Sequence, residues 1–113
     1  EDFVPQEEIG AKLKRVLALG PSHAGVTLGA DGYRWADASG GGHQPAFAVD
    51  VVDTTGAGDA FHGAFTLALV EGQPVEDCAR FACAVAAMKC TRVGSRAGLP
   101  TRAQVESFLA ART

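Results

Sequence analysis

The chain has 113 residues, of which 47% are hydrophobic and 20% charged, and its formal net charge at pH 7 is −3. This composition excludes a disordered chain, and without a basic block the sequence offers no electrostatic basis for binding nucleic acid or a membrane surface. No apolar run reaches the roughly 18–20 residues needed to span a bilayer. We therefore expect one small globular domain, or part of a larger one, with neither nucleic acid nor a membrane as its partner.

The cysteines bear on the cellular compartment. Cys78, Cys83 and Cys90 are odd in number, and no two of them form a CxxC pair. We interpret them as small core residues of a reducing, cytoplasmic protein, not as disulfides or zinc ligands. The acidic and polar first residues, EDFVPQEE, are not typical of a signal peptide.

The first part of the chain predicts a helix followed by two strands. Residues 5–19 carry apolar side chains at helical spacing, and Gly20-Pro21 ends this helix. The sequence GVTL (25–28) predicts a short buried strand. GADG (29–32) then predicts a tight turn, and YRWAD (33–37) a second strand.

The middle of the chain predicts a third strand and two helices. ASGGGHQ (38–44) is interpreted as a flexible connection or hairpin tip, and PAFAVDVV (45–52) as the third strand. A nearly all-apolar helix is expected over about 58–70 and another over about 75–90, separated by the breaker Gly72-Gln73-Pro74. Both helices are expected to pack on one face of the sheet.

The end of the chain predicts a loop and a last helix. CTRVGSRAGLP (90–100) is the loop, and the helix begins at Thr101. Thr101 with Gln104 three residues later has the form of a capping box. Because helices and strands alternate along the sequence, the fold class is expected to be α/β.

The strand-to-helix junction VDTTGAGDAF (52–61) is the segment most indicative of chemistry. The first turn of a helix has unpaired N–H groups and the positive end of the helix dipole, and glycines let a ligand approach the backbone closely. Such a junction suits a phosphate or a developing phosphoryl charge. Asp59 would repel a bound anion, but a carboxylate beside the anion can accept a proton from a hydroxyl group.

A structural interpretation of the same residues is open as well. Asp59 can cap the helix, and the glycines can serve a tight turn and close packing. Two other phosphate motifs are excluded: the sequence has no GxxxxGK[ST], and Gly56 and Gly58 are not followed by the third glycine of GxGxxG.

The stretch DTTGAGDAFHGAF resembles the C-terminal signature of the ribokinase-like (PfkB-type) carbohydrate and nucleoside kinases. The order around it is similar too: a VTLGADG strand and turn before it, two helices after it, then a GLPT loop and a closing helix. The resemblance implies an α/β, ribokinase-like fold in which residues 1–113 form the C-terminal, nucleotide-binding portion of a three-layer α/β/α kinase domain. The N-terminal sugar-binding part of such a domain is absent from this sequence.

The resemblance also implies roles for single residues. Asp59 corresponds to the catalytic base, and the amides of Gly56, Ala57 and Gly58 to the anion hole. Residues implied to contact the nucleotide are Thr27, Gly29 and Gly32 at the phosphates and Ala82 and Ala86 near the adenine. The implied cofactors are ATP with Mg²⁺.

A monovalent cation, K⁺, is implied by the same resemblance. Its ligands would be Asp53 and the carbonyls of Thr55, Lys89 and Gly94, where Asp53 can alternatively only stabilise a turn. The chain departs from several family members at Gly98, where they carry a serine hydroxyl.

The implied function of the parent protein is ATP-dependent phosphorylation of a hydroxyl on a sugar or sugar derivative, with a small-molecule sugar and ATP as partners. Two alternatives are a nucleoside kinase of the same family and a non-catalytic nucleotide-binding relative. FHGAF, and MKC followed by GSRAGLP, are more similar to the ketose-type and sugar-acid branches than to adenosine kinase. The chain alone is expected to be inactive. It should also expose a face that favours self-association, for which a homodimer is the simplest form.

Overall fold

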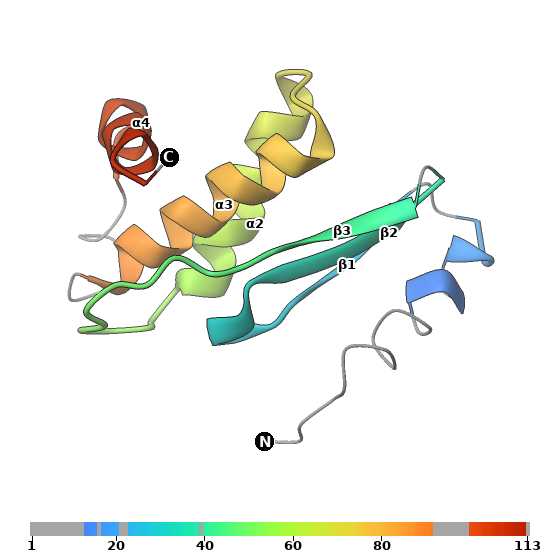
Figure 1. Ribbon diagram of the computed structural model, residues 1–113, viewed down its shortest axis with the longest axis horizontal. Helices are drawn as coiled ribbons and strands as arrows, with labels where there is room; N and C mark the ends of the chain where they lie inside the picture. Colours follow the sequence, from blue (N-terminus) through green and yellow to red (C-terminus); the bar gives the residue numbers. More distant parts are fainter. Residues whose placement is uncertain (1–12, 16, 21–22, 39, 92–99, 113) are drawn as a thin grey trace.

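The computed structural model describes residues 13–15, 17–20, 23–38, 40–91 and 100–112 (Figure 1). Residues 13–15 and 17 are helical, in line with the predicted first helix, most of which lies outside the described residues. The following elements are β1 (His23–Thr27), the 3₁₀ turn η1 (Gly29–Asp31), β2 (Tyr33–Asp37), β3 (Gly40–Gln44), α2 (Ala57–Val70), α3 (Val75–Cys90) and α4 (Arg102–Ala110).

The three strands form one antiparallel sheet in the order β1-β2-β3. The predicted turn between β1 and β2 is confirmed, because the amide of Leu28 donates to the Gly32 carbonyl at 2.7 Å. Gly32 has φ 91°, a left-handed conformation that favours glycine. A Cβ at this position would lie 2.0 Å from the Gln44 carbonyl oxygen, so the turn also needs glycine to pass β3.

Two predictions about the middle of the chain are wrong. The glycine-rich residues 40–44 form β3 and are not a hairpin tip, whereas residues 45–52 form no strand. β3 pairs with β2 through the backbone, and Trp35 faces Gly42 in the register. Glycine is what allows this pairing, since a Cβ on Gly42 would lie 2.5 Å from the Trp35 ring. After β3, the amide of Val52 donates to the Cys90 carbonyl instead of to a strand.

Helices α2 and α3 lie side by side on one face of the sheet, as predicted (Figure 1). Side chains alternate between the two faces of β2, so Tyr33 and Trp35 point into the main core. The other buried residues of this core are Phe61, Ala64, Ala79, Ala82, Cys83, Ala84, Val85 and Val105. A smaller cluster of Leu13, Ala24 and Ala36 covers the other face.

Two of the three cysteines lie in the core, as predicted. Cys78 and Cys83 are buried core residues, and all three thiols are free. Burial raises the pKa of Cys83 to about 11, so this thiol is neutral at ordinary pH. In the part of the chain that the structure describes, no helix has the length and apolar character to cross a bilayer.

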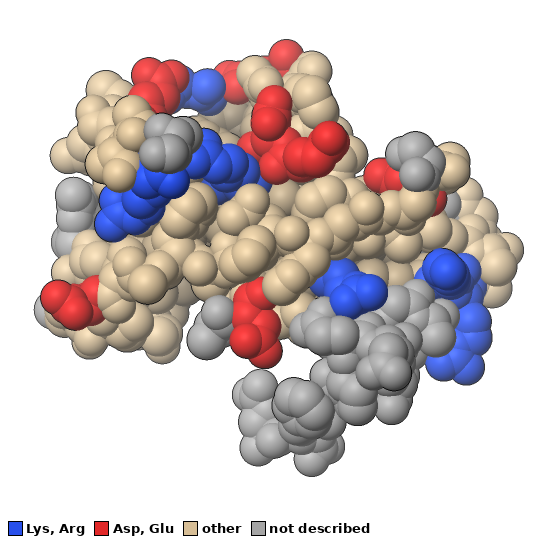
Figure 2. Space-filling view, viewed as in Figure 1, with Lys and Arg blue, Asp and Glu red and all other residues tan. Residues whose placement is uncertain are grey.

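Helix α4 begins with the predicted capping box. The Gln104 amide donates to Thr101 Oγ1 at 3.2 Å, and the Thr101 amide donates to Gln104 Oε1 at 2.8 Å. The helix packs Val105 into the core. Figure 2 shows that charged side chains gather over α3 and α4, whereas the surface over β3 carries few of them.

Candidate active site

The candidate site is built on the turn that leads into α2. The Ala57 amide donates to the Thr54 carbonyl at 3.1 Å, and Gly56 between them has φ 75° and ψ 5°. These angles are those of the third residue of a type II turn, which requires a positive φ and therefore favours glycine. Gly56 is also the N-cap residue of α2, and no side chain caps this helix.

The turn decides which backbone amides are open to a ligand. The Ala57 amide is occupied by Thr54, and the Ala60 amide by Gly56. The amides of Gly58 and Asp59 make no hydrogen bond to any residue described in the structure. Of the three predicted anion-hole residues, Ala57 therefore has an occupied amide, whereas the amides of Gly56 and Gly58 make no hydrogen bond to a described residue. The open amide of Asp59 lies next to that of Gly58.

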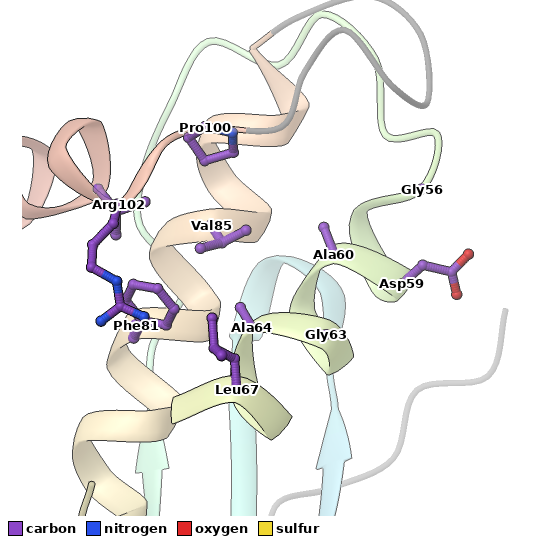
Figure 3. Close-up of a pocket in the computed structure, with 11 residues that line it drawn as sticks. Gly56, Asp59, Ala60, Gly63, Ala64, Leu67, Phe81, Val85, Pro100 and Arg102 are labelled. Atoms are coloured by element: carbon purple, nitrogen blue, oxygen red, sulfur yellow. The ribbon is translucent and has the colours of Figure 1, made fainter. Parts of the chain in front are cut away.

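Asp59 is the third residue of α2 and is exposed. Within the described ranges its carboxylate takes part in no hydrogen bond or ion pair, so the structure gives no support to the interpretation of Asp59 as a helix cap. In Figure 3 the side chain points away from Phe81 and Arg102, toward the open side of the helix. The carboxylate is therefore free to accept a proton from an incoming group.

A pocket of about 460 Å³ lies on the other side of α2, between this helix, α3 and the start of α4. Its floor is apolar and is formed by Ala60, Ala64, Leu67, Phe81, Val85 and Val105. Gly56 and Asp59 contribute to one end of the pocket and Arg102 to the other. The Arg102 guanidinium is already engaged, because it donates to Glu71 at 2.9 Å and lies over the Phe81 ring.

The predicted nucleotide contacts have different surroundings. Thr27 is exposed at the end of β1, and the η1 turn with Gly29 lies at the same end of the molecule as the start of α2 (Figure 1). Ala82 is fully buried in the core and offers no surface to a ligand in this arrangement, whereas Ala86 is half-buried. A contact between Ala82 and an adenine therefore does not fit this conformation.

The predicted cation ligands are only partly described. Asp53 Oδ1 accepts a hydrogen bond from the Thr55 amide at 2.8 Å, which is the turn-stabilising role considered for it above. The Lys89 carbonyl accepts the Thr91 amide, and Gly94 and Gly98 lie outside the described residues. Among the described residues, no three His, Cys, Asp or Glu side chains gather as a metal centre.

One backbone contact near the site has no counterpart among the sequence predictions. The Cys90 carbonyl, at the end of α3, accepts hydrogen bonds from the amides of Val52 and Asp53 at 2.7 and 3.0 Å. This contact joins the C-terminus of α3 to the segment that leads into α2. A backbone acceptor has no side-chain signature, so no pattern in the sequence indicates it.

Both the sequence and the structure of the chain match known proteins. The sequence pattern of the pfkB family carbohydrate kinases matches residues 2–102. Ribokinase from Bacillus subtilis (strain 168) is 41% identical over 97 residues, which is 86% of this chain and 33% of that protein. The structure of Arabidopsis thaliana ribokinase complexed with ribose and ATP matches with a TM-score of 0.87 and 36% identity, over 93% of this chain and 34% of that one.

A third match is a double mutant of fructokinase from Vibrio cholerae O395 in its fructose, ADP and potassium ion bound form, with a TM-score of 0.81 and 30% identity over 90% of this chain and 35% of that one. The chain thus spans about a third of the length of the relatives it matches. The predicted α/β, ribokinase-like fold is confirmed. Since the family pattern covers most of its sequence, the chain belongs to the pfkB family of carbohydrate kinases.

Proposed function

We propose that the protein containing these 113 residues transfers the γ-phosphoryl group of ATP to a hydroxyl of a sugar or sugar derivative. The observation that carries this proposal is the exposed Asp59 carboxylate, without a hydrogen-bond partner among the described residues, beside the open amides of Gly58 and Asp59. Relatives that include ribokinases and a fructokinase support a sugar as the acceptor. A nucleoside acceptor remains the alternative.

The geometry suggests how these residues share the reaction. Asp59 would accept the proton of the acceptor hydroxyl. The oxygen of that hydroxyl would form a bond to the γ-phosphorus, and the bond between the γ-phosphorus and the bridging oxygen of ADP would break. The open amides and the positive end of the α2 dipole would stabilise the negative charge on the transferring group.

The proposed reaction would also involve two cations, Mg²⁺ and K⁺. Mg²⁺ bound with the nucleotide would neutralise phosphate charge during the transfer. The oxygen atoms of the Asp53 carboxylate and the Thr55 carbonyl are ligands that suit a hard cation such as K⁺. Support for K⁺ comes from the potassium-bound fructokinase among the matched structures.

The test is Asp59→Asn in the complete protein, because this change keeps the shape of the side chain and removes the base. We expect kcat to fall by about 10²-fold or more, with the dissociation constant for ATP little changed. The matched control is Asp77→Asn, since Asp77 is also exposed and is the third residue of α3. The control should keep its activity. Near-normal turnover of the Asp59 variant on ribose, fructose and nucleosides alike would refute the proposal.

A further inference from the structure

We propose that Asp53 is a positioning residue that fixes the direction of the open amides at the start of α2. This inference rests on the proposed function of Gly58 and Asp59. It differs from a cation-ligand role for Asp53, because it depends on the side chain as a hydrogen-bond acceptor and not on its charge.

The side chain of Asp53 is hydrogen-bonded to the turn that precedes α2. Asp53 Oδ1 accepts the Thr55 amide at 2.8 Å, which forms an Asx turn over residues 53–55. The next turn starts at once, because the Thr54 carbonyl accepts the Ala57 amide. The two turns overlap, so a rotation at Thr55 would also reorient Gly56 and the amides that follow it.

The backbone of Asp53 is itself held by a hydrogen bond to the end of α3. Its amide donates to the Cys90 carbonyl at 3.0 Å, beside the Val52 amide on the same oxygen. Helix α3 is held firmly by the core, where most of its inward-facing residues are buried. Asp53 therefore links the end of α3 to the turn that precedes α2.

The side chains of this turn are exposed. Thr54, Thr55, Gly58 and Asp59 are exposed, so side-chain packing contributes little to the orientation of the turn. Hydrogen bonds must therefore fix the orientation of the turn. Because small displacements of groups that stabilise a transition state lower the rate strongly, the expected effect of loosening the turn is on kcat.

The experiment compares three substitutions in the complete protein. Asp53→Ala removes the acceptor, Asp53→Asn keeps an oxygen in the same place without charge, and Asp53→Ser offers a hydroxyl that makes the same turn more weakly. We expect kcat to fall by about tenfold or more in the Ala variant and by less than about threefold in the Asn variant, with Ser between them. If the Ala variant does not fold, the order of the Asn and Ser variants still tests the proposal.

Two further measurements separate the positioning role from the other roles. The loss in the Ala variant should persist at saturating K⁺, and it should be smaller in a Gly58→Ala background, where a methyl group already crowds the open amides. Equal losses for Asn and Ala, recovery at high K⁺, or an undiminished loss in the Gly58→Ala background would overturn the positioning role. Normal turnover of Asp59→Asn alone would instead refute the proposed function, so the two failures are distinguishable.

As a control for a purely structural effect, Thr101→Ala removes a comparable turn-forming acceptor at the start of α4. It should lower the thermal stability of the protein without changing kcat. A fall in kcat in this control equal to that of Asp53→Ala would show that loosening any helix start slows the enzyme, and would overturn the specific role of Asp53.

Discussion

Gly42 lies directly against the indole ring of Trp35, so that a methyl group on Gly42 would come within 2.5 Å of Trp35 Cζ2. The two residues are also paired across β2 and β3. Trp35 belongs to the main core, together with Tyr33 and Phe61. The glycine-rich strand therefore forms part of the wall that encloses the largest side chain of the sheet.

This contact predicts the effect of Gly42→Ala on stability. The added methyl group would displace the indole from the core, and such overpacking costs about 1–3 kcal/mol in the free energy of unfolding. Urea denaturation of the complete protein measures this loss. In a Trp35→Phe background, where the ring is shorter, the same substitution should cost less. An equal cost in both backgrounds would show that the ring is not what the methyl group meets.

Gly58→Ala is expected to separate stability from activity. A Cβ on Gly58 would meet nothing within 4 Å, so the substitution should leave the fold intact and stabilise α2 by up to about 1 kcal/mol. The same methyl group would crowd a phosphoryl group at the open amides, so we expect kcat to fall by about tenfold or more.

The control for Gly58 is Gly63→Ala in the same helix, where a Cβ would also meet nothing within 4 Å. This substitution should stabilise the helix and leave turnover unchanged. Full activity of Gly58→Ala would mean that no anion approaches this backbone closely, and the anion-binding part of the proposal would be abandoned.

The ring of His23 predicts a pH dependence of stability. Burial lowers the pKa of His23 below its ordinary value of 6.5, although the nearby Asp37 carboxylate opposes this shift. The Nε2 atom hydrogen-bonds the Tyr33 hydroxyl at 2.9 Å, and the buried Nδ1 has no partner within the described part of the chain. The folded state thus favours the neutral ring.

Because the unfolded chain takes up the proton first as the pH falls, stability should decrease below about pH 6.5 until the folded pKa is reached. Urea midpoints measured between about pH 5 and 8 would show this slope. His23→Gln should flatten it, whereas His62→Gln, on the exposed face of α2, should not. Identical slopes for all three proteins would exclude His23 as the source.

Much of this fold could be predicted from local patterns. β2, the turn at Gly32, both long helices and the capping box at Thr101 follow from hydrophobic periodicity and from the positions of glycine and proline. The sequence predicts a flexible connection or hairpin tip over residues 38–44, because three glycines usually indicate a loop. Residues 40–44 instead form a strand, in which Gly42 has no side chain that would meet the Trp35 ring.

Only part of the candidate site could likewise be predicted from the sequence. Asp59 and the glycines before it could be proposed as a candidate site from the sequence, because the chemistry of a helix start depends on adjacent residues. The contact between the Cys90 carbonyl and Asp53 joins backbone atoms that are distant along the chain, and no residue type encodes it. The loss of the Ala57 amide to Thr54 depends on the turn type, which the sequence alone does not fix.

The last prediction is that these 113 residues alone do not phosphorylate a sugar. A general base must lie within roughly 2.6–3.2 Å of the hydroxyl that it activates, so another group has to hold the acceptor there. The Asp59 carboxylate points away from Phe81 and Arg102 (Figure 3), and the 460 Å³ pocket behind it has an apolar floor. Arg102 in that pocket already binds Glu71. No set of polar side chains that could hold sugar hydroxyls lines the pocket between the described helices.

Weak binding of ATP should nevertheless persist, because the η1 turn and the start of α2 are both formed. Calorimetry with ATP and a coupled assay with ribose or fructose, on this chain and on the complete protein in parallel, would measure the two properties separately. The chain is also expected to self-associate, since Leu69 and Val70 expose 50% and 80% of their surface at the end of α2, which gel filtration would detect. Sugar-dependent consumption of ATP by the chain alone, abolished by Asp59→Asn, would show instead that the acceptor site lies within these residues.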